Sequence, residues 1–169
     1  QFLSVVAGDA RQPFVEGSGR LELARAIAAA DNPLTARVIV NRMWMYYFDV
    51  PLVQTPSDFG VRSAPPSHPA LLDYLAGYLV DHQWSLKALA RLILNSGTYQ
   101  QASFDRADGR AVDPENRLLW RMNRKRLDFE GLRDALLMAA GQLDATVGGP
   151  SVEITAVPWP RRRTLYAMI

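Results

Sequence analysis

The segment "NPLTARVIVNRMWMYYF", residues 32–48, carries the strongest indication of the fold. Its apolar residues cover nearly the whole circumference of a helix that begins near Pro33, and a helix of this kind is expected to be buried. Arg37, Asn41 and Arg42 interrupt this pattern, and Arg37 and Asn41 share a face because they are four residues apart. A buried guanidinium without a partner is costly, so we expect an acceptor near Arg37. The candidate acceptors are Asp58, Asp73, Asp128 and Asp134.

These polar residues allow two interpretations. In the first, Arg37 and Asn41 fasten the proline-rich stretch 50–67 to the helices and hold the fold together. In the second, they line a pocket for an anionic or carbohydrate ligand, with Trp44 as its wall. Structural ion-pair networks perturb buried groups as readily as active sites do, and this favours the structural interpretation.

The spacing of apolar residues and the cap residues predict a mainly α protein, a helical bundle of about five to six helices. Ser67 and Ser85 are the expected N-caps of two of these helices. Leu137 and Met138 lie outside the apolar stripe of the last helix and suggest a contact with another domain. The helices are predicted at residues 20–30, 33–48, 68–82, 86–96, 113–120 and 128–143.

The remaining segments are predicted to be irregular or extended. Residues 1–19 form an extended lead-in, and the proline-rich stretch forms a long, ordered loop that buries Leu52, Val53, Phe59 and Val61. The stretch "SFDRADGRAVD", residues 103–113, is predicted to be a polar loop. In residues 144–169 "SVEITAV" alternates like a strand, and "RTLYAMI" is its expected partner in a small C-terminal β element. "GGPS", residues 148–151, predicts a tight turn, with an anion-binding nest as the alternative.

The length of 169 residues fits one domain, 1–169, which we interpret as an excised fragment of a larger chain. The absence of cysteine excludes disulfides, thiolate metal sites, a thiol nucleophile and a covalently attached c-type haem within this chain. No apolar run is long enough to span a membrane.

Catalytic signals are sparse. His68 and His82 lack the i, i+4 spacing of a helical zinc pair, so no metal site is predicted. Asp58 and His68 are the weak catalytic candidates, and no nucleophile elbow is present. The basic cluster at residues 117–126 is flanked by acidic residues, which predicts an internally paired surface and argues against nucleic-acid binding.

Several motifs occur together in a fixed order: "RLELARAIAAADNPLTARVIVNRMW", "TPSDFGVRSAPPSHPALLDYLA", "WSLKALARLILNSGTYQQAS", "DPENRLLWRMNRKRLDFEGLRDALL" and "GGPSV". This order resembles the planctomycete-specific domain of unknown function DUF1553, found C-terminally in cytochrome-type multidomain proteins. The resemblance covers about residues 19–169. It implies an exported protein of the periplasm or cell envelope, with other domains of the same protein as partners. It also implies c-type haem in a separate upstream domain and no cofactor in this chain.

The resemblance brings no established activity. The residues that match its motifs are interpreted as a binding or structural polar network. That network is Arg37, Asn41, Arg42, Asp58, His68, Arg126, Asp128 and Arg133.

Three functions follow from these observations. The first is an interaction or assembly scaffold beside redox domains, which predicts paired polar residues and an exposed apolar patch. The second is an enzyme domain that acts on a cell-envelope polysaccharide, with Asp58, His68 and Arg37 converging on a cleft. The third, nucleic-acid binding through residues 117–126, requires an unpaired arginine stripe.

Overall fold

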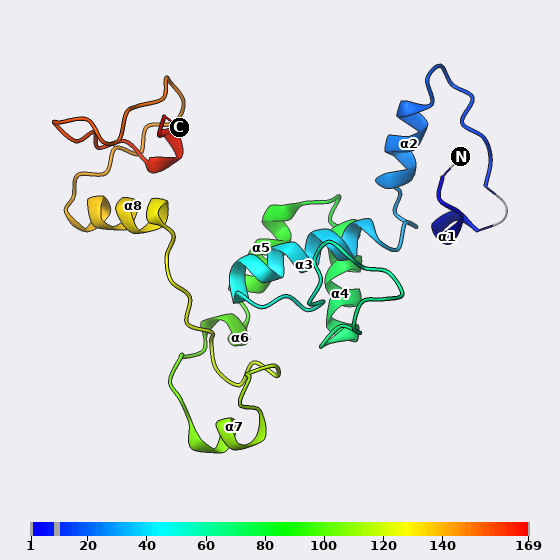
Figure 1. Cartoon of the computed structure of the whole chain (residues 1–169), viewed down its shortest axis with the longest axis horizontal. Helices are drawn as coiled ribbons and strands as arrows, with labels where there is room; N and C mark the ends of the chain where they lie inside the picture. Colours follow the sequence, from blue (N-terminus) through cyan, green and yellow to red (C-terminus); the bar gives the residue numbers. More distant parts are fainter. Residues whose placement is uncertain (1, 9–10, 169) are drawn as a thin grey trace. The chain divides into compact units, whose positions relative to one another are not determined.

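The computed structural model describes residues 2–8 and 11–168 and is mainly helical (Figure 1). The chain divides into two compact units, Gln1–Arg124 and Lys125–Ile169. The first unit contains α1 (Ser4–Ala7), α2 (Arg20–Ile27), α3 (Thr35–Phe48), α4 (Pro69–Asp81), α5 (Leu86–Leu94), α6 (Gly97–Gln100) and α7 (Ala107–Val112). The second unit contains α8 (Phe129–Ala139) and the 3-10 helix η1 (Thr164–Tyr166).

Asn32 joins the end of α2 to the start of α3. Its amide nitrogen donates to the carbonyl oxygens of Ala26 (3.2 Å) and Ile27 (3.1 Å), which end α2. Its amide oxygen accepts from the backbone N–H groups of Leu34 (3.0 Å) and Thr35 (3.4 Å) at the start of α3. One buried side chain therefore satisfies backbone groups at the end of α2 and at the start of α3, although the N-cap residue of α3 is Leu34.

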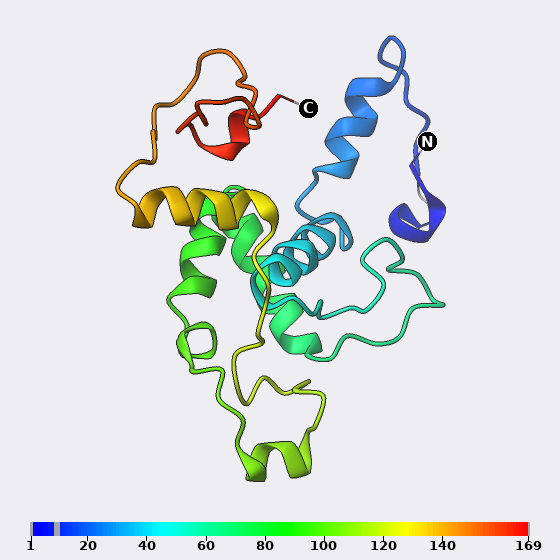
Figure 2. The same cartoon turned by 60° about the vertical axis from the view of Figure 1, so that its left-hand side comes forward.

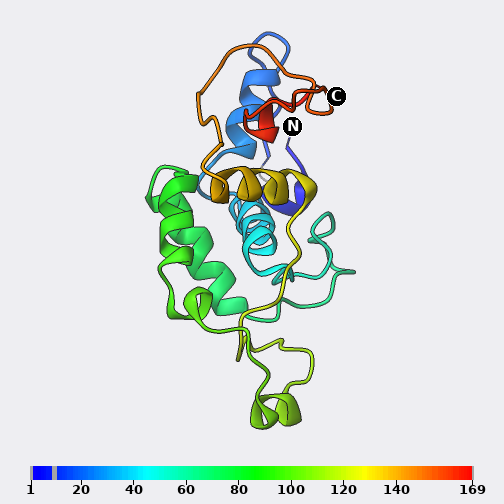
Figure 3. The same ribbon diagram turned by 90° about the vertical axis from the view of Figure 1, so that its left-hand side faces the viewer.

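The core of the first unit lies among α3, α4 and α5. These three helices lie side by side in Figures 1, 2 and 3, and α4 packs against both of the others. The N-cap predicted at Ser85 is confirmed, because its side chain accepts from the backbone N–H of Ala88 at 3.2 Å. Ser67 does not cap α4, since His68 is the N-cap and no side chain makes the capping bond. The core consists of Ala36, Val40, Trp44, Phe48, Leu52, Val53, Leu72, Leu75, Ala76, Leu79, Leu89 and Ile93.

Only one side of α3 is buried, which corrects the prediction of a helix buried all round. Its buried apolar residues recur every four positions from Ala36 to Phe48. Arg37 is half-buried, and Arg42 and Tyr46 are exposed. Neighbouring elements cover α3 on one side, so the apolar composition of the helix overstates its burial.

The proline-rich stretch follows α3 and enters the core at its beginning. Leu52 and Val53 are each 2% exposed, as predicted for this loop. Phe59 packs against the core from a half-buried position. Val61, however, is fully exposed, so the expectation that it is buried is wrong.

The helix predicted at 113–120 does not form. The carboxylate of Asp113 accepts from the backbone N–H groups of Arg117 (3.0 Å) and Leu118 (2.7 Å) and closes a turn. Asn116 and Leu119 have φ angles of 55° and 56°, which no helix allows. Instead, α7 forms within the segment 103–113 that was predicted to be a loop.

The C-terminal β element is reduced to two isolated bridges, both parallel, and no strand forms among residues 2–8 and 11–168. Asp144 pairs with Arg162, and Val152 pairs with Ala167. The predicted partner segments therefore meet but do not form a ladder. Pro150, Pro158 and Pro160 lie in or beside these segments and have no N–H to donate, which limits pairing.

Candidate functional site

Asn41 is fully buried and binds the proline-rich stretch. Its amide nitrogen donates to the carbonyl oxygen of Val53 at 3.0 Å, and its amide oxygen accepts from the N–H of Val53 at 2.9 Å. Both polar groups of one buried backbone residue are satisfied by a single side chain. Asn41 therefore fastens the loop to α3.

Arg37 lies one turn earlier on α3 and contacts a different partner. Its Nε donates to the Oδ1 of Asp73 on α4 at 2.7 Å, and its Nη1 donates to the carbonyl oxygen of Pro33. Asp73 was one of four predicted acceptors. Arg37 also borders an open groove of about 460 Å³ beneath the proline-rich stretch, so its guanidinium bridges α3 and α4 beside solvent.

The two weak catalytic candidates do not converge. The Oδ1 of Asp58 accepts from the N–H of Gly60 at 2.9 Å, within its own loop. The Nδ1 of His68 lies 3.0 Å from the Oγ of its neighbour Ser67. Neither residue makes a hydrogen bond or ion pair with Arg37 among the described residues, so the predicted catalytic trio is not assembled by direct contacts.

The remaining predicted network residues have separate positions. Arg42 is exposed on α3, and Arg126 is exposed at the beginning of the second unit. Asp128 is the N-cap of α8, where its Oδ1 accepts from the N–H of Gly131 at 2.8 Å. Arg133 holds the C-terminal segment of the second unit. The eight predicted residues therefore divide into several local sets of contacts.

The basic cluster at 117–126 is paired at its centre. Arg121 lies 3.2 Å from Asp105 and covers the ring of Trp120 at 5.1 Å, and Arg106 lies 5.7 Å from the same ring. Asn116 is buried and donates to the carbonyl oxygen of Arg121 at 2.8 Å. The arginine at the centre of the cluster thus contributes to the local structure.

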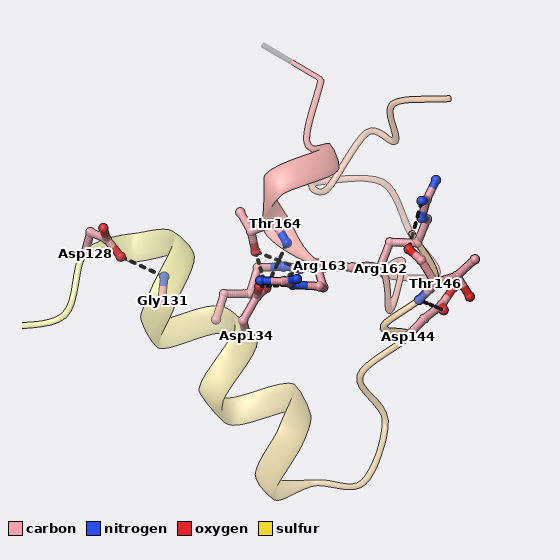
Figure 4. Close-up of polar contacts among 9 residues, drawn as sticks. Asp128, Gly131, Asp134, Asp144, Thr146, Arg162, Arg163 and Thr164 are labelled. Carbon is pink, nitrogen blue, oxygen red and sulfur yellow. Dashed lines mark hydrogen bonds and ion pairs between the residues drawn. The ribbon is translucent and has the colours of Figure 1, made fainter. Parts of the chain in front are cut away.

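In the second unit α8 directs polar residues toward the C-terminal segment (Figure 4). The Oδ1 of Asp134 accepts from the backbone N–H (2.8 Å) and the Oγ1 (2.7 Å) of Thr164. Nη1 of Arg133 donates to the Oγ1 of Thr164 at 3.1 Å and to the carbonyl oxygen of Arg162 at 3.0 Å. Its Nη2 donates to the carbonyl oxygen of Pro160.

The pKa of Asp134 is shifted by its surroundings. Partial burial raises its pKa, but the hydrogen bonds from Thr164 and the charges of Arg133 and Arg163 outweigh that effect. The net result is a pKa below the ordinary value of an aspartate. The contact is therefore made by the ionised carboxylate.

The "GGPS" turn surrounds a cation. Arg162 donates to the carbonyl oxygens of Thr146 (3.4 Å), Gly148 and Pro150 (2.8 Å), and its guanidinium covers the ring of Tyr166 at 4.1 Å. Carbonyl oxygens that point inward bind positive charge, whereas an anion-binding nest requires N–H groups. Residues 148 and 149 form a bend, and the inward carbonyl oxygens make the arrangement the opposite of a nest.

The apolar side of α8 is exposed. None of its residues is buried; Phe129 is 61% exposed, Leu132 49% and Leu136 63%. This side borders a groove of about 360 Å³, here called the α8 groove, whose lining is almost entirely apolar. The α8 groove is lined by Phe129, Leu132, Arg133, Leu136, Leu137, Ile154, Thr155, Trp159 and Pro160.

Sequence reasoning missed Asp134 as a partner of Thr164, and it missed the role of Arg162. Asp134 was considered only as an acceptor for Arg37, because periodicity places it on α8 without identifying what faces it. The three consecutive arginines 161–163 read as one charged run, although Arg162 is half-buried while its two neighbours are exposed. In an extended segment successive side chains point to opposite sides, and this alternation is the signal that could have identified Arg162.

Over the part of the chain that the structure describes, no cluster of His, Asp or Glu side chains has the composition of a metal site. No helix in the same residues is both long and apolar enough to cross the hydrocarbon layer of a bilayer.

Comparison with known families identifies the family of this chain. A family model described as "Protein of unknown function (DUF1553)" matches residues 19–169. The chain therefore belongs to the DUF1553 family, as the order of its motifs predicts. Neither the curated proteins nor the solved structures contain a significant match.

Proposed function

We propose that this chain is a non-catalytic interaction module and that the α8 groove is its contact surface. The observation that carries the proposal is the orientation of α8. Its polar residues Arg133 and Asp134 hold the C-terminal segment of the same unit, while its apolar residues remain exposed. An amphipathic helix usually faces inward with its apolar side, so the reverse arrangement indicates a surface that another molecule covers.

The chemistry of the α8 groove defines the occupant. Arg133 is the one charged residue among the described residues that line it, and its guanidinium is already bound by Pro160, Arg162 and Thr164. A charged partner would find no counter-ion there. The occupant we propose is an apolar segment of a neighbouring protein domain, with Trp159 and Phe129 as anchoring aromatic residues.

The resemblance described above makes the cytochrome-type domains of an exported multidomain protein the first neighbours to test. The polar residues of the helical unit support a structural role. Asn41 binds Val53, Arg37 binds Asp73, and neither Asp58 nor His68 joins them. An enzymatic function would need these groups to converge on a substrate.

Binding of the chain to an isolated neighbouring domain, measured by titration calorimetry, tests the proposal. Leu136→Glu places a charge in the α8 groove and is expected to weaken binding by at least about tenfold. Leu165→Glu is the matched control, because Leu165 is 74% exposed and Leu136 63%, but Leu165 does not line the groove. Its expected effect is less than about twofold.

Circular dichroism of both variants checks that the fold is retained. Absence of binding by the wild-type chain would overturn the proposal. Equal weakening by the two substitutions would show that the contact surface is not the α8 groove.

A further inference from the structure

A second hollow lies in the helical unit and is separate from the α8 groove. It has a volume of about 400 Å³, and its apolar lining comes from α3, α4, α5 and Leu119. A smaller hollow of about 20 Å³ adjoins it, and Trp44, His68 and Leu119 border both. We call the two together the Trp44 hollow. Its size lies within the range of small-molecule sites.

Trp44 borders both hollows and carries a hydrogen-bond donor. The residue is 5% exposed, and its ring stacks on Phe48 with centroids 4.1 Å apart. Its indole N–H makes no hydrogen bond to any residue that the structure describes. An indole N–H can only donate, and a buried tryptophan usually has an acceptor. The indole nitrogen is not among the fully buried polar atoms of the described residues, so its N–H is available to an acceptor from outside the chain.

His68 and Arg117 provide further donors. The Nδ1 of His68 lies 3.0 Å from the hydroxyl oxygen of Ser67. When this hydroxyl donates to Nδ1, the ring proton resides on Nε2, which has no hydrogen-bond partner in the described part of the chain. Arg117 borders the smaller hollow, as do Trp44 and His68, and the side chain of each can donate a hydrogen bond.

The lining also indicates the charge and shape of the ligand. Neither Asp nor Glu occurs among the described residues that border the Trp44 hollow, so an anion meets no repulsion from its walls. The larger hollow is walled chiefly by Leu71, Leu75, Ile93 and Leu119. Such walls suit a ring and not a hydrated inorganic anion.

We propose that the Trp44 hollow binds a small aromatic carboxylate. The ring occupies the larger, apolar hollow. The carboxylate lies where the two hollows meet, accepts hydrogen bonds from the indole of Trp44 and from His68, and faces Arg117 across the smaller hollow. This site is independent of the α8 groove, and each can fail without the other.

Nuclear magnetic resonance of the whole chain tests this site directly. The chain contains four tryptophans, so an ¹⁵N spectrum shows few indole signals, and triple-resonance assignment identifies that of Trp44. The probe is cinnamate, and cinnamamide is its uncharged analogue. We expect cinnamate to shift the indole signal of Trp44 in a saturable way, with the signal of Trp159 unchanged. Cinnamamide is expected to bind at least about tenfold more weakly, because it lacks the charge that strengthens each hydrogen bond.

Two arginine substitutions separate the site from general charge effects. Arg117→Gln is expected to weaken cinnamate binding about tenfold. Arg91→Gln, an exposed arginine on α5 that borders neither hollow, is expected to leave binding unchanged. An unshifted Trp44 signal at the solubility limit of cinnamate would overturn the proposal. So would equal binding of cinnamate and cinnamamide, or equal weakening by the two substitutions.

Discussion

The two units of this chain are stabilised by different interactions. The first unit buries a continuous apolar core from three helices and a loop. In the second unit Thr164 is the one buried residue among those described, and it is bound by Arg133 and Asp134. Hydrophobic burial is non-directional, whereas hydrogen bonds fix particular atoms. A unit held by polar contacts can therefore leave its apolar side chains free for a partner.

A matched pair of leucine substitutions tests this contrast with the largest expected effect. Leu79→Ala removes a side chain that is 0% exposed and is expected to lower the free energy of unfolding by about 2–5 kcal/mol. Leu136→Ala, at a residue 63% exposed, is expected to change it by less than about 0.5 kcal/mol. Urea unfolding followed by circular dichroism measures both. A similar loss for the two variants would mean that α8 is packed into a core.

Asn41→Ala is expected to destabilise the first unit by about 2–4 kcal/mol, because it leaves the N–H and the carbonyl of Val53 buried without partners. Asn95→Ala is the control, since Asn95 is exposed at the end of α5 and should cost less than about 0.5 kcal/mol. Thermal unfolding of both variants measures the difference. If Asn41→Ala were as mild as its control, the loop would not depend on this side chain.

Arg133→Ala should act on the second unit alone. It removes a side chain that is 12% exposed, together with its bonds to Pro160, Arg162 and Thr164. The free energy of local opening around Thr164, measured by hydrogen exchange, should fall by about 1–3 kcal/mol. Arg126→Ala, at an exposed arginine of the same unit, should have no such effect. Faster exchange in α3 or α4 would contradict the independence of the two sets of contacts.

The smallest expected effect is a dependence on pH. The pKa of Asp134 is lower in the folded chain than in the unfolded chain, so its contribution to stability is present above the ordinary aspartate pKa of 3.8. This contribution is lost as the pH falls through the lowered pKa. Exchange of the Thr164 amide, corrected for intrinsic rates, should therefore accelerate below pH 3.8. Asp134→Asn should remove this pH dependence, and an unchanged profile would exclude Asp134 as its cause.

The same contrast explains how much of the fold the sequence could predict. The helices of the first unit follow from local signals, such as the cap at Ser85 and the apolar spacing of α4 and α5. Periodicity identifies which residues share a face, but not the direction in which that face points. The spacing of Phe129, Leu132 and Leu136 places them on one face of α8, yet this face is exposed. Its orientation depends on the distant contact between Asp134 and Thr164.

Contacts between residues far apart in the sequence were the second feature that the sequence could not predict. The need of Arg37 for an acceptor follows from its position on α3, but the choice among four aspartates depends on how α4 packs. The helix predicted at 113–120 failed because Asp113, a good helix cap, instead closes a turn with the amides of Arg117 and Leu118. The Trp44 hollow requires two segments to meet around Trp44 and His68, and no local pattern contains that information.

Thiol labelling at position 136 tests most directly whether the apolar side of α8 awaits a partner. The chain has no cysteine, so Leu136→Cys introduces a single thiol. Its maleimide labelling, followed by mass spectrometry of the peptide, should be fast in the isolated chain and at least about tenfold slower when neighbouring domains are present. Val61→Cys, at a fully exposed position of the proline-rich stretch, should react equally in both. Equal rates at position 136 in both states, or protection in the isolated chain that grows with its concentration, would contradict a neighbouring domain as the occupant.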